Sequence, residues 1–402
     1  MVSKILAVSA AILIFVCILL VSSVDLGSVA VELSSQKADP DQELDRLLSL
    51  AYVDHVVNDP APNVSGITVY DKSKSSPGYT VFSSKDSGAI YLMDMDGKIL
   101  HNWSISSNGV WNAWWLFDDL SVVGVYNGVE DNVVKIGWDS NIIWRLKGPY
   151  HHDVSVSPEG NVYTLRRSLR RGVWLGERKI DIMDNLIMVF DSNGKYVKNV
   201  SLYSMLWDKV DERRIKLVSK NFKTSPIDVF HTNTVAVLDR DLGYARKGNV
   251  LISVRHMDLI AIVDIGMEKV VWMWGPGEIE FPHKPTILED GNILLFDNGN
   301  LRRYSRAVIV DPKTKEIVWN YTAPKPKSFY SNSCGSAEKL PNGNVLITES
   351  NKGRLFEVTP AGEIVWEYLN QFRNSEGERM IIARSKRYPV GEFDNALAQT
   401  TA

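Results

Sequence analysis

Hydrophobic and polar positions alternate with a period of two over many short segments of the chain, and turn residues separate these segments. The segments recur in a fixed order: a Gly-Asn turn, an apolar segment, a second segment that ends near Asp, another turn and an Ile/Val-x-Trp close. The clearest copies begin with GNVYTL, GNVLISV, GNILLF and GNVLITE. Alternation of this kind between tight turns is typical of antiparallel strands, so we expect an all-β protein.

The tryptophans that close the copies give the period of the repeat. They are Trp103, Trp144, Trp272, Trp319 and Trp366. Neighbouring members are 41 or 47 residues apart, except for a gap of 128 residues after Trp144 that holds two longer copies. A period of this size indicates units stacked or ringed around one axis. Six units of three or four strands predict a six-bladed β-propeller over residues 78–390.

The ends of this region suggest how the ring closes. The first unit, which begins at Gly78, has too few strands for a complete blade. The segment IIARSKRYP, residues 381–389, follows the last closing tryptophan and has no blade of its own. We therefore expect this C-terminal strand to complete the first blade, and residues 391–402 to form a tail.

An uncharged, mainly apolar run at residues 5–24 precedes the repeats. Its length suits a membrane span, which takes about 20 residues, and exceeds the apolar region of a typical cleaved signal. Lys4 before the run and Asp25 after it predict that the following chain lies outside the cytoplasm. We expect a membrane anchor over residues 1–25, a helical linker over residues 26–77 and a periplasmic or extracellular propeller. The alternative is a cleaved signal and a secreted propeller.

Composition narrows the possible partners. The chain has 45 basic and 48 acidic residues, so it lacks the basic excess that pairs with a phosphate backbone, and we expect no nucleic-acid partner. Cys17 lies within the apolar run, which leaves Cys334 without an expected disulfide partner. Four Asn-x-Ser/Thr sites are compatible with an extracytoplasmic domain: Asn63, Asn102, Asn199 and Asn320.

Positions at equal phase in the repeat should form a ring around the channel of a propeller. Aligning the starts of the innermost strands selects His152, His231 and His283, and also Asn112 and Gly335. Counting six residues forward from the turn Asn selects Arg167, Arg255, Asn298 and Ser350. A hairpin brings these two phases to the same end of a blade. We therefore predict one channel mouth that carries three histidines and two arginines, with Asn233 beside His231.

Five segments at these positions resemble the arylsulfotransferase family. They are HHDVSVSPEGN (151–161), HTNTVAVL (231–238), SVRHMDLIAIVD (253–264), FPHKPTILEDGNILLFDNGN (281–300) and RYSRAVIVD (303–311). Members of this family are extracytoplasmic six-bladed propeller enzymes that need no nucleotide sulfate donor. The resemblance implies that His283 becomes transiently sulfated and that Arg255 binds the sulfonate. It also matches the family's His-x-Asn pair to His231 and Asn233, and its remaining active-site histidine to His152.

The chemistry of these residues suits the implied reaction, the transfer of a sulfuryl group from a phenolic sulfate ester to a phenolic acceptor. A guanidinium binds the three sulfonate oxygens, a neutral imidazole can attack sulfur, and a second imidazole, His231 or His152, can exchange a proton with the phenols. Arg167 and Asn298 are the further candidates for substrate binding. No Walker motif and no strand–GxGxxG–helix unit is present, so we expect no nucleotide and no other cofactor.

Two alternatives remain at this point. One is a metal-dependent propeller enzyme with His152, His231 and His283 as ligands, although Arg255 in the same ring would repel a bound cation. The other is a non-catalytic propeller that serves as a binding platform, since a fold alone does not define a function.

Overall fold

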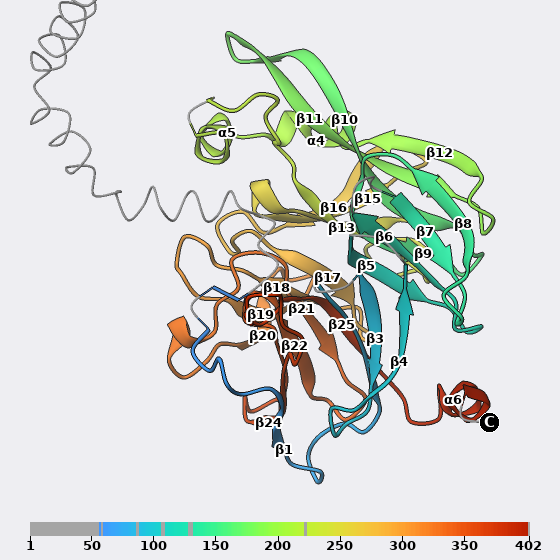
Figure 1. The fold of residues 1–402 in the computed structure, drawn as a ribbon. Coiled ribbons are helices and arrows are strands. Elements are labelled where there is room, and N and C mark those ends of the chain that lie inside the picture. Colours follow the sequence, from blue (N-terminus) through green and yellow to red (C-terminus); the bar gives the residue numbers. More distant parts are fainter. Residues whose placement is uncertain are drawn as a thin grey trace, which may run out of the picture. The chain divides into compact units, whose positions relative to one another are not determined.

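The repeats form six antiparallel sheets in a computed structural model of the protein (Figure 1). The structure describes residues 56–400, apart from residue 58 and the segments 86–87, 106–108, 128–131 and 221–222. The innermost strands contact one another in the circular order β25, β5, β9, β13, β17, β21 and again β25. This arrangement confirms the predicted six-bladed β-propeller.

The strands of each blade run outward from the axis in chain order, except that blade 1 starts with the last strand of the chain and blade 6 ends with the first. Blade 1 contains β25 (Ile382–Tyr388), β2 (Tyr79–Ser84), β3 (Ala89–Met93) and β4 (Ile99–Ser104). Blade 2 contains β5 (Val110–Leu116), β6 (Val122–Asn127), β7 (Asn132–Ile136) and β8 (Ile142–Lys147). Blade 3 contains β9 (Tyr150–Val156), β10 (Val162–Leu175), β11 (Arg178–Phe190) and β12 (Tyr196–Ser201).

The second half of the ring follows the same plan. Blade 4 contains β13 (Thr232–Val237), β14 (Val250–Val254), β15 (Leu259–Asp264) and β16 (Lys269–Trp274). Blade 5 contains β17 (His283–Ile287), β18 (Ile293–Asp297), β19 (Arg306–Val310) and β20 (Ile317–Tyr321). Blade 6 contains β21 (Ser336–Lys339), β22 (Val345–Glu349), β23 (Arg354–Val358), β24 (Ile364–Leu369) and β1 (Gly66–Tyr70).

The closure of the ring is as predicted. Strand β25 pairs antiparallel with β2, with Tyr388 opposite Tyr79 and Ile382 opposite Ser84. The segment 381–389 therefore completes blade 1, and contacts between β21 and β25 join the last blade to the first.

The closing tryptophans join neighbouring blades. In each of them the indole Nε1 donates a hydrogen bond of 2.9–3.1 Å to a backbone carbonyl of the next blade. The pairs are Trp103 with Leu120, Trp144 with Ser192, Trp272 with Pro312, Trp319 with Pro360 and Trp366 with Met95. A large apolar ring with one donor at its edge suits this place, because it can pack against the blade and satisfy a turn carbonyl at once.

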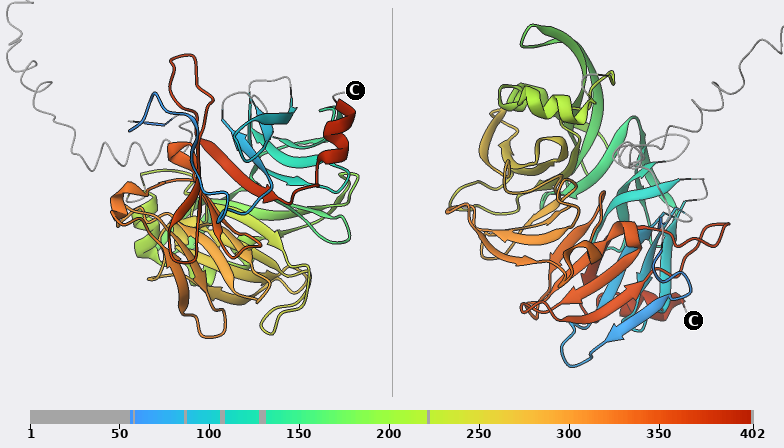
Figure 2. Two further views of the ribbon diagram at one scale, coloured as in Figure 1. Left: turned by 90° about the horizontal axis from the view of Figure 1, so that it is seen from below. Right: turned by 90° about the vertical axis from the view of Figure 1, so that its left-hand side faces the viewer.

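One insertion interrupts the repeat. Between β12 and β13 the chain forms α4 (Leu202–Leu206), the 3-10 turn η1 (Trp207–Lys209) and α5 (Glu212–Val218), close to the long hairpin of β10 and β11 (Figures 1 and 2). Three further 3-10 turns are η2 (Arg255–Met257), η3 (Pro326–Ser328) and η4 (Ser350–Lys352). Turn η2 contacts α5, so the insertion lies beside the chain segment that carries Arg255.

Two segments differ from the expected outline. Strand β1 lies within the predicted linker but pairs with β24 as a fifth strand of blade 6. The predicted tail contains α6 (Asp394–Thr400), and Phe393 before this helix is fully buried beside Trp103. Neither segment is a copy of the repeat, so the repeat pattern did not predict their positions.

The predicted anchor at residues 1–25 and residues 26–55 of the predicted helical linker lie outside the described residues. Within the described part of the chain, no helix has the length and apolar character needed to span a membrane.

Candidate active site

Five neighbouring blades carry a β-bulge near the start of the innermost strand, at the predicted mouth. The extra residues are Ala383 in β25, Asn112 in β5, residues 152–153 in β9, Asn233 in β13 and one of residues 284–285 in β17. A bulge bends the strand and changes the direction of the side chains beside it. His152 and His231 also have positive φ angles of 63° and 42°, a conformation that is unfavourable for residues other than glycine and that is often found at functional sites.

Residues at the two repeat positions chosen from the sequence do contact each other. In blade 5, His283 Nδ1 lies 2.7 Å from Asn298 Oδ1, and in blade 2 the amide of Asn112 donates to Asn127 Oδ1. Each pair joins the start of an innermost strand to the end of the next strand, so the hairpin brings them to one end of the blade as expected.

Three imidazoles lie next to one another across blades 3 and 4. The ring of His231 has the ring of His152 on one side, with centroids 4.8 Å apart, and the ring of His256 at 4.5 Å. Burial lowers the pKa of His152 and His231 well below the ordinary value of 6.5, and the charges of Arg167 and Arg255 lower it further. Both rings are therefore neutral at neutral pH, and both arginines lie close enough to act on them.

The hydrogen bonds of His283 define its tautomer. The amide nitrogen of Asn298 donates to the carbonyls of Ser331 and Cys334 at 2.7 and 2.8 Å, so the oxygen of this buried amide faces His283. An amide oxygen only accepts, which means that Nδ1 of His283 carries the proton and Nε2 keeps a free lone pair. Burial and the charge of Arg255 lower the pKa of His283 to about 3, so the ring is neutral. A neutral imidazole with a free Nε2 is a competent nucleophile.

Arg255 is held in place by His256. Arg255 is only 7% exposed, and its Nη1 donates to His256 Nε2 at 2.9 Å. The other ring nitrogen of His256 donates to the carbonyl of Asp228 at 2.6 Å. His256 thus uses both ring nitrogens to orient Arg255. Burial lowers the pKa of Arg255 to about 10, which leaves its positive charge intact at neutral pH.

Asp228 was not among the predicted site residues. Its carboxylate accepts a hydrogen bond from His231 Nδ1 at 2.6 Å and another from the His231 backbone N–H at 3.0 Å. Because Nδ1 forms this contact, Nε2 is the ring nitrogen of His231 that a substrate can use, and the carboxylate would stabilise the ring when it becomes protonated. The residue lies before the repeat begins in blade 4, and its only sequence signal is its position three residues before His231.

Asn233 and Arg167 complete the predicted set. The Asn233 side chain donates to the carbonyl of Pro282 at 2.8 Å, directly before His283, so it ties blade 4 to the start of β17. Arg167 lies opposite Asn185 in the pairing of β10 with β11, and its charge lowers the pKa of His152.

Below the mouth, the axis holds a buried ion cluster that sequence reasoning did not find. Asp153 accepts hydrogen bonds from Lys284 at 2.8 Å and from Arg384 at 2.9 Å, which joins blades 3, 5 and 1. Burial and the charge of Arg384 lower the pKa of Lys284 to about 8, while Asp153 opposes this shift. Both Asp153 and Lys284 lie in bulges. A bulge shifts the alternation of side chains, so counting residues along a regular strand does not predict that these two face each other.

A metal ion fits this site poorly. Asp228, His231 and His256 offer ligand atoms within 4.8 Å of one another, a different trio from the histidines His152, His231 and His283 considered above. Both ring nitrogens of His256 already form hydrogen bonds, one of them with the guanidinium of Arg255. A cation bound here would have to break that bond and lie beside a positive charge.

The fold and site together describe a six-bladed propeller whose mouth combines neutral imidazoles with a buried guanidinium. Residues 116–373, more than half of the chain, match the model of the family described as arylsulfotransferase (ASST), and the chain belongs to this family. Membership supports a transferase at the level of the family. No curated protein sequence matches the chain.

One similar solved structure supports the fold and nothing beyond the fold. A protein of unknown function from Bacteroides caccae has a TM-score of 0.53 at 12% identity, and the match covers 77% of this chain and 98% of that chain. A streptogramin B lyase has a TM-score of 0.45 at 12% identity over 84% of this chain and 97% of that chain.

Proposed function

We propose that the protein is an aryl sulfotransferase that moves a sulfuryl group from a phenolic sulfate ester to a phenolic acceptor through a sulfohistidine at His283. The observation that supports this most directly is the free lone pair on Nε2 of a neutral His283, held in this tautomer by Asn298. Family membership supports the sulfuryl group as the group transferred.

In the first half-reaction, Nε2 of His283 attacks sulfur, and the bond between sulfur and the phenolic oxygen breaks. The electron pair of that bond leaves with the phenolic oxygen, which departs as a phenolate or, when it is a poor leaving group, takes a proton from protonated His231. His283 keeps its Nδ1 proton, so the sulfated ring is cationic. Arg255 pairs with the sulfonate oxygens, and its planar fork suits their geometry. Asn298 Oδ1 stabilises the charge on the ring through Nδ1–H.

In the second half-reaction, the acceptor phenol gives its proton to Nε2 of His231, and its oxygen attacks sulfur. The bond between sulfur and His283 breaks, and the electron pair returns to Nε2. Asp228 stabilises the imidazolium that His231 becomes, which then releases the proton to solvent or to the departed phenolate. His152, beside His231, is the alternative base.

The test is to incubate the protein with a chromogenic nitrophenyl sulfate, with and without phenol, and to measure both released nitrophenol and the intact protein mass. We expect a mass increase of one sulfuryl group without phenol and its loss when phenol is added. His283→Asn should keep the fold and lose both signals, whereas His101→Asn, a change at a histidine on the outer strand β4, should keep both. Normal turnover by His283→Asn would disprove the assignment and make His152 the next residue to test.

We also propose that the propeller lies outside the cytoplasm, anchored by the apolar run at residues 5–24. The four Asn-x-Ser/Thr asparagines that the sequence offers, at positions 63, 102, 199 and 320, are all exposed, which is compatible with that location. Fractionation with N-terminal sequencing tests this proposal. A membrane-bound protein that keeps Met1 would support the anchor, and a soluble form that begins between Ser22 and Glu32 would show cleavage instead.

A further inference from the structure

The turn that carries Arg255 has an unusual residue at its end. In blade 6 the corresponding 3-10 turn η4 ends at Gly353, which has a φ of 56° and is glycine as this left-handed conformation favours. In blade 4, η2 ends at Asp258 with a φ of 52°. An aspartate in this left-handed conformation costs more free energy than a glycine would, which suggests that its side chain has a role.

Asp258 is the point where three segments meet. Its Oδ1 accepts a hydrogen bond from the backbone N–H of Phe281 at 2.7 Å and another from Nη2 of Arg214 at 2.6 Å. Arg214 belongs to α5 in the insertion, and its Nε also donates to the carbonyl of His256 at 2.6 Å. Arg214 therefore binds the turn η2 at two acceptors, on either side of Met257.

The same contacts lead to both proposed reacting groups. The Phe281 ring contacts the guanidiniums of Arg214 and Arg255, whose Cζ atoms lie 4.5 and 4.8 Å from its centroid. The carbonyl of Phe281 lies 3.2 Å from Nδ1 of His283. The bridge from Arg214 through Asp258 to Phe281 thus supports the turn of Arg255 on one side and the start of β17 on the other.

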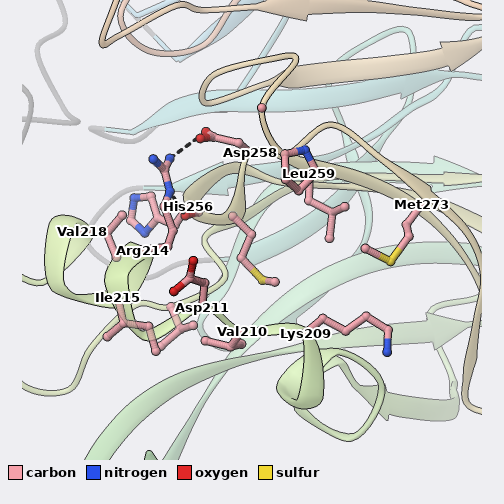
Figure 3. A pocket seen from close by; sticks show the side chains of 14 residues that line it. Lys209, Val210, Asp211, Arg214, Ile215, Val218, His256, Asp258, Leu259 and Met273 are labelled. Atoms are coloured by element: carbon pink, nitrogen blue, oxygen red, sulfur yellow. Dashed lines mark hydrogen bonds and ion pairs between the residues drawn. The ribbon is translucent and has the colours of Figure 1, made fainter. Parts of the chain in front are cut away.

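Apolar packing between α5 and blade 4 is incomplete at this place. A cavity of about 180 Å³ separates α5 from blade 4, lined in part by Ile215, Met257 and Asp258. Figure 3 shows Arg214 and Asp258 at this cavity, joined by their ion pair, with His256 beside them. Both partners are largely buried, with side-chain exposures of 16% and 13%, so the ion pair is little screened by water.

We propose that Arg214 is a positioning residue for sulfuryl transfer: through Asp258 and the carbonyl of His256, the insertion fixes the turn that carries Arg255. This inference rests on the proposed function for its effect on rate. It assigns to the insertion a role that no copy of the repeat supplies, since the other blades lack an equivalent of α5 among the described residues.

The test compares Arg214→Met with Arg213→Met, its neighbour on the same helix, whose 89% exposed side chain pairs only with Asp211 among the contacts of the structure. Arg214→Met should lower kcat/KM for nitrophenyl sulfate by about 10- to 100-fold, the usual effect of a small misplacement of a catalytic group, and Arg213→Met should change it less than about twofold. In an Arg255→Lys background, Arg214→Met should cost less than about twofold, because the group that it positions is already altered. A purely structural role would give the same loss in both backgrounds and would overturn the proposal.

A second measurement is independent of turnover. Crystal structures of the wild type and of Arg214→Met should show the 2.9 Å contact between Arg255 and His256 Nε2 kept in the first and lost in the second. If the wild type turns over no aryl sulfate, the proposed function fails, and this contact alone decides the role of Arg214. If Arg214→Met does not fold, Asp258→Gly takes its place, since glycine suits the φ of this residue and removes the acceptor. An unmoved Arg255 in either variant would contradict the proposal.

Discussion

At the scale of single residues, the nucleophile depends on a neighbour that does not react. When His283 gains a sulfuryl group its ring becomes cationic, so its hydrogen bond to Asn298 becomes charge-assisted. A hydrogen bond to a charged group contributes about 1.5–3 kcal/mol, and we therefore expect Asn298→Ala to slow formation of the sulfated protein roughly 10- to 100-fold. Single-turnover mass spectrometry measures this rate. Asn292→Ala, in the exposed turn at the other end of the same hairpin, is the matched control and should leave it unchanged. A wild-type rate in Asn298→Ala would show that this amide does not stabilise the sulfated ring.

His231 should confer a pH dependence on donors with poor leaving groups but not on donors with good leaving groups. Because burial keeps its pKa well below 6.5, the protonated form is scarce at pH 8 and becomes about tenfold more abundant for each pH unit toward its pKa. Phenyl sulfate, whose phenolate needs a proton, should therefore release phenol faster as the pH falls from 8 to 6. Nitrophenyl sulfate should show little change, since its anion leaves unaided and His283, with a pKa of about 3, stays neutral. Burst kinetics with the two donors measure the difference, and His231→Asn should abolish the slope. A slope of equal size for both donors would assign the titration to another group.

Much of this site could be predicted from the phase of the repeat. Equal phase selected His152, His283 and Arg255 because strands of equal length end at the same height in neighbouring blades. Asp228, which orients His231, and Arg214, which supports the turn of Arg255, lie in the insertion and have no counterpart in the repeat. Contacts between elements that are distant in sequence leave no local signal, and only the folded structure shows them.

At the scale of elements, each closing tryptophan links its blade to the next one, which accounts for the recurrence of tryptophan in the repeat. Trp272→Phe keeps an aromatic side chain but removes the indole Nε1–H, and with it the buried hydrogen bond to the carbonyl of Pro312. An unsatisfied buried carbonyl costs about 1–3 kcal/mol, so the free energy of unfolding should fall by this amount. Trp319→Phe removes the same bond to Pro360 at an exposed position, where water can replace the indole, and it should cost less than Trp272→Phe. Urea denaturation measures both, and equal losses would mean that the ring volume, not the hydrogen bond, matters.

The elements that sequence reasoning missed share a physical cause. Strand β1 carries no turn signal of the repeat and adds to the outer edge of blade 6, where the Thr68 hydroxyl donates to Glu367 across the strands. A fifth strand pairs with the backbone of an edge strand that is already formed, so the sequence of that edge strand does not predict the pairing. The blades themselves were predictable because each repeats its own turns and alternation.

At the scale of the whole molecule, stability depends on one strand that joins the two ends of the domain. Deletion of all residues after Gln371 removes β25, leaves β2 unpaired on its inner side and opens the ring between blades 6 and 1. An open ring exposes two edges and the apolar faces between the blades, so we expect this variant to unfold or aggregate.

A deletion after Pro389 is the control: it keeps β25 but removes Phe393, which is fully buried against Trp103 and Tyr79. Loss of such a side chain costs about 3–5 kcal/mol, so this variant should be less stable but should still unfold cooperatively. Circular dichroism during urea denaturation separates the two outcomes. Cooperative unfolding with native-like stability after truncation at Gln371 would show that five complete blades and a partial one suffice, and that β25 does not close the ring.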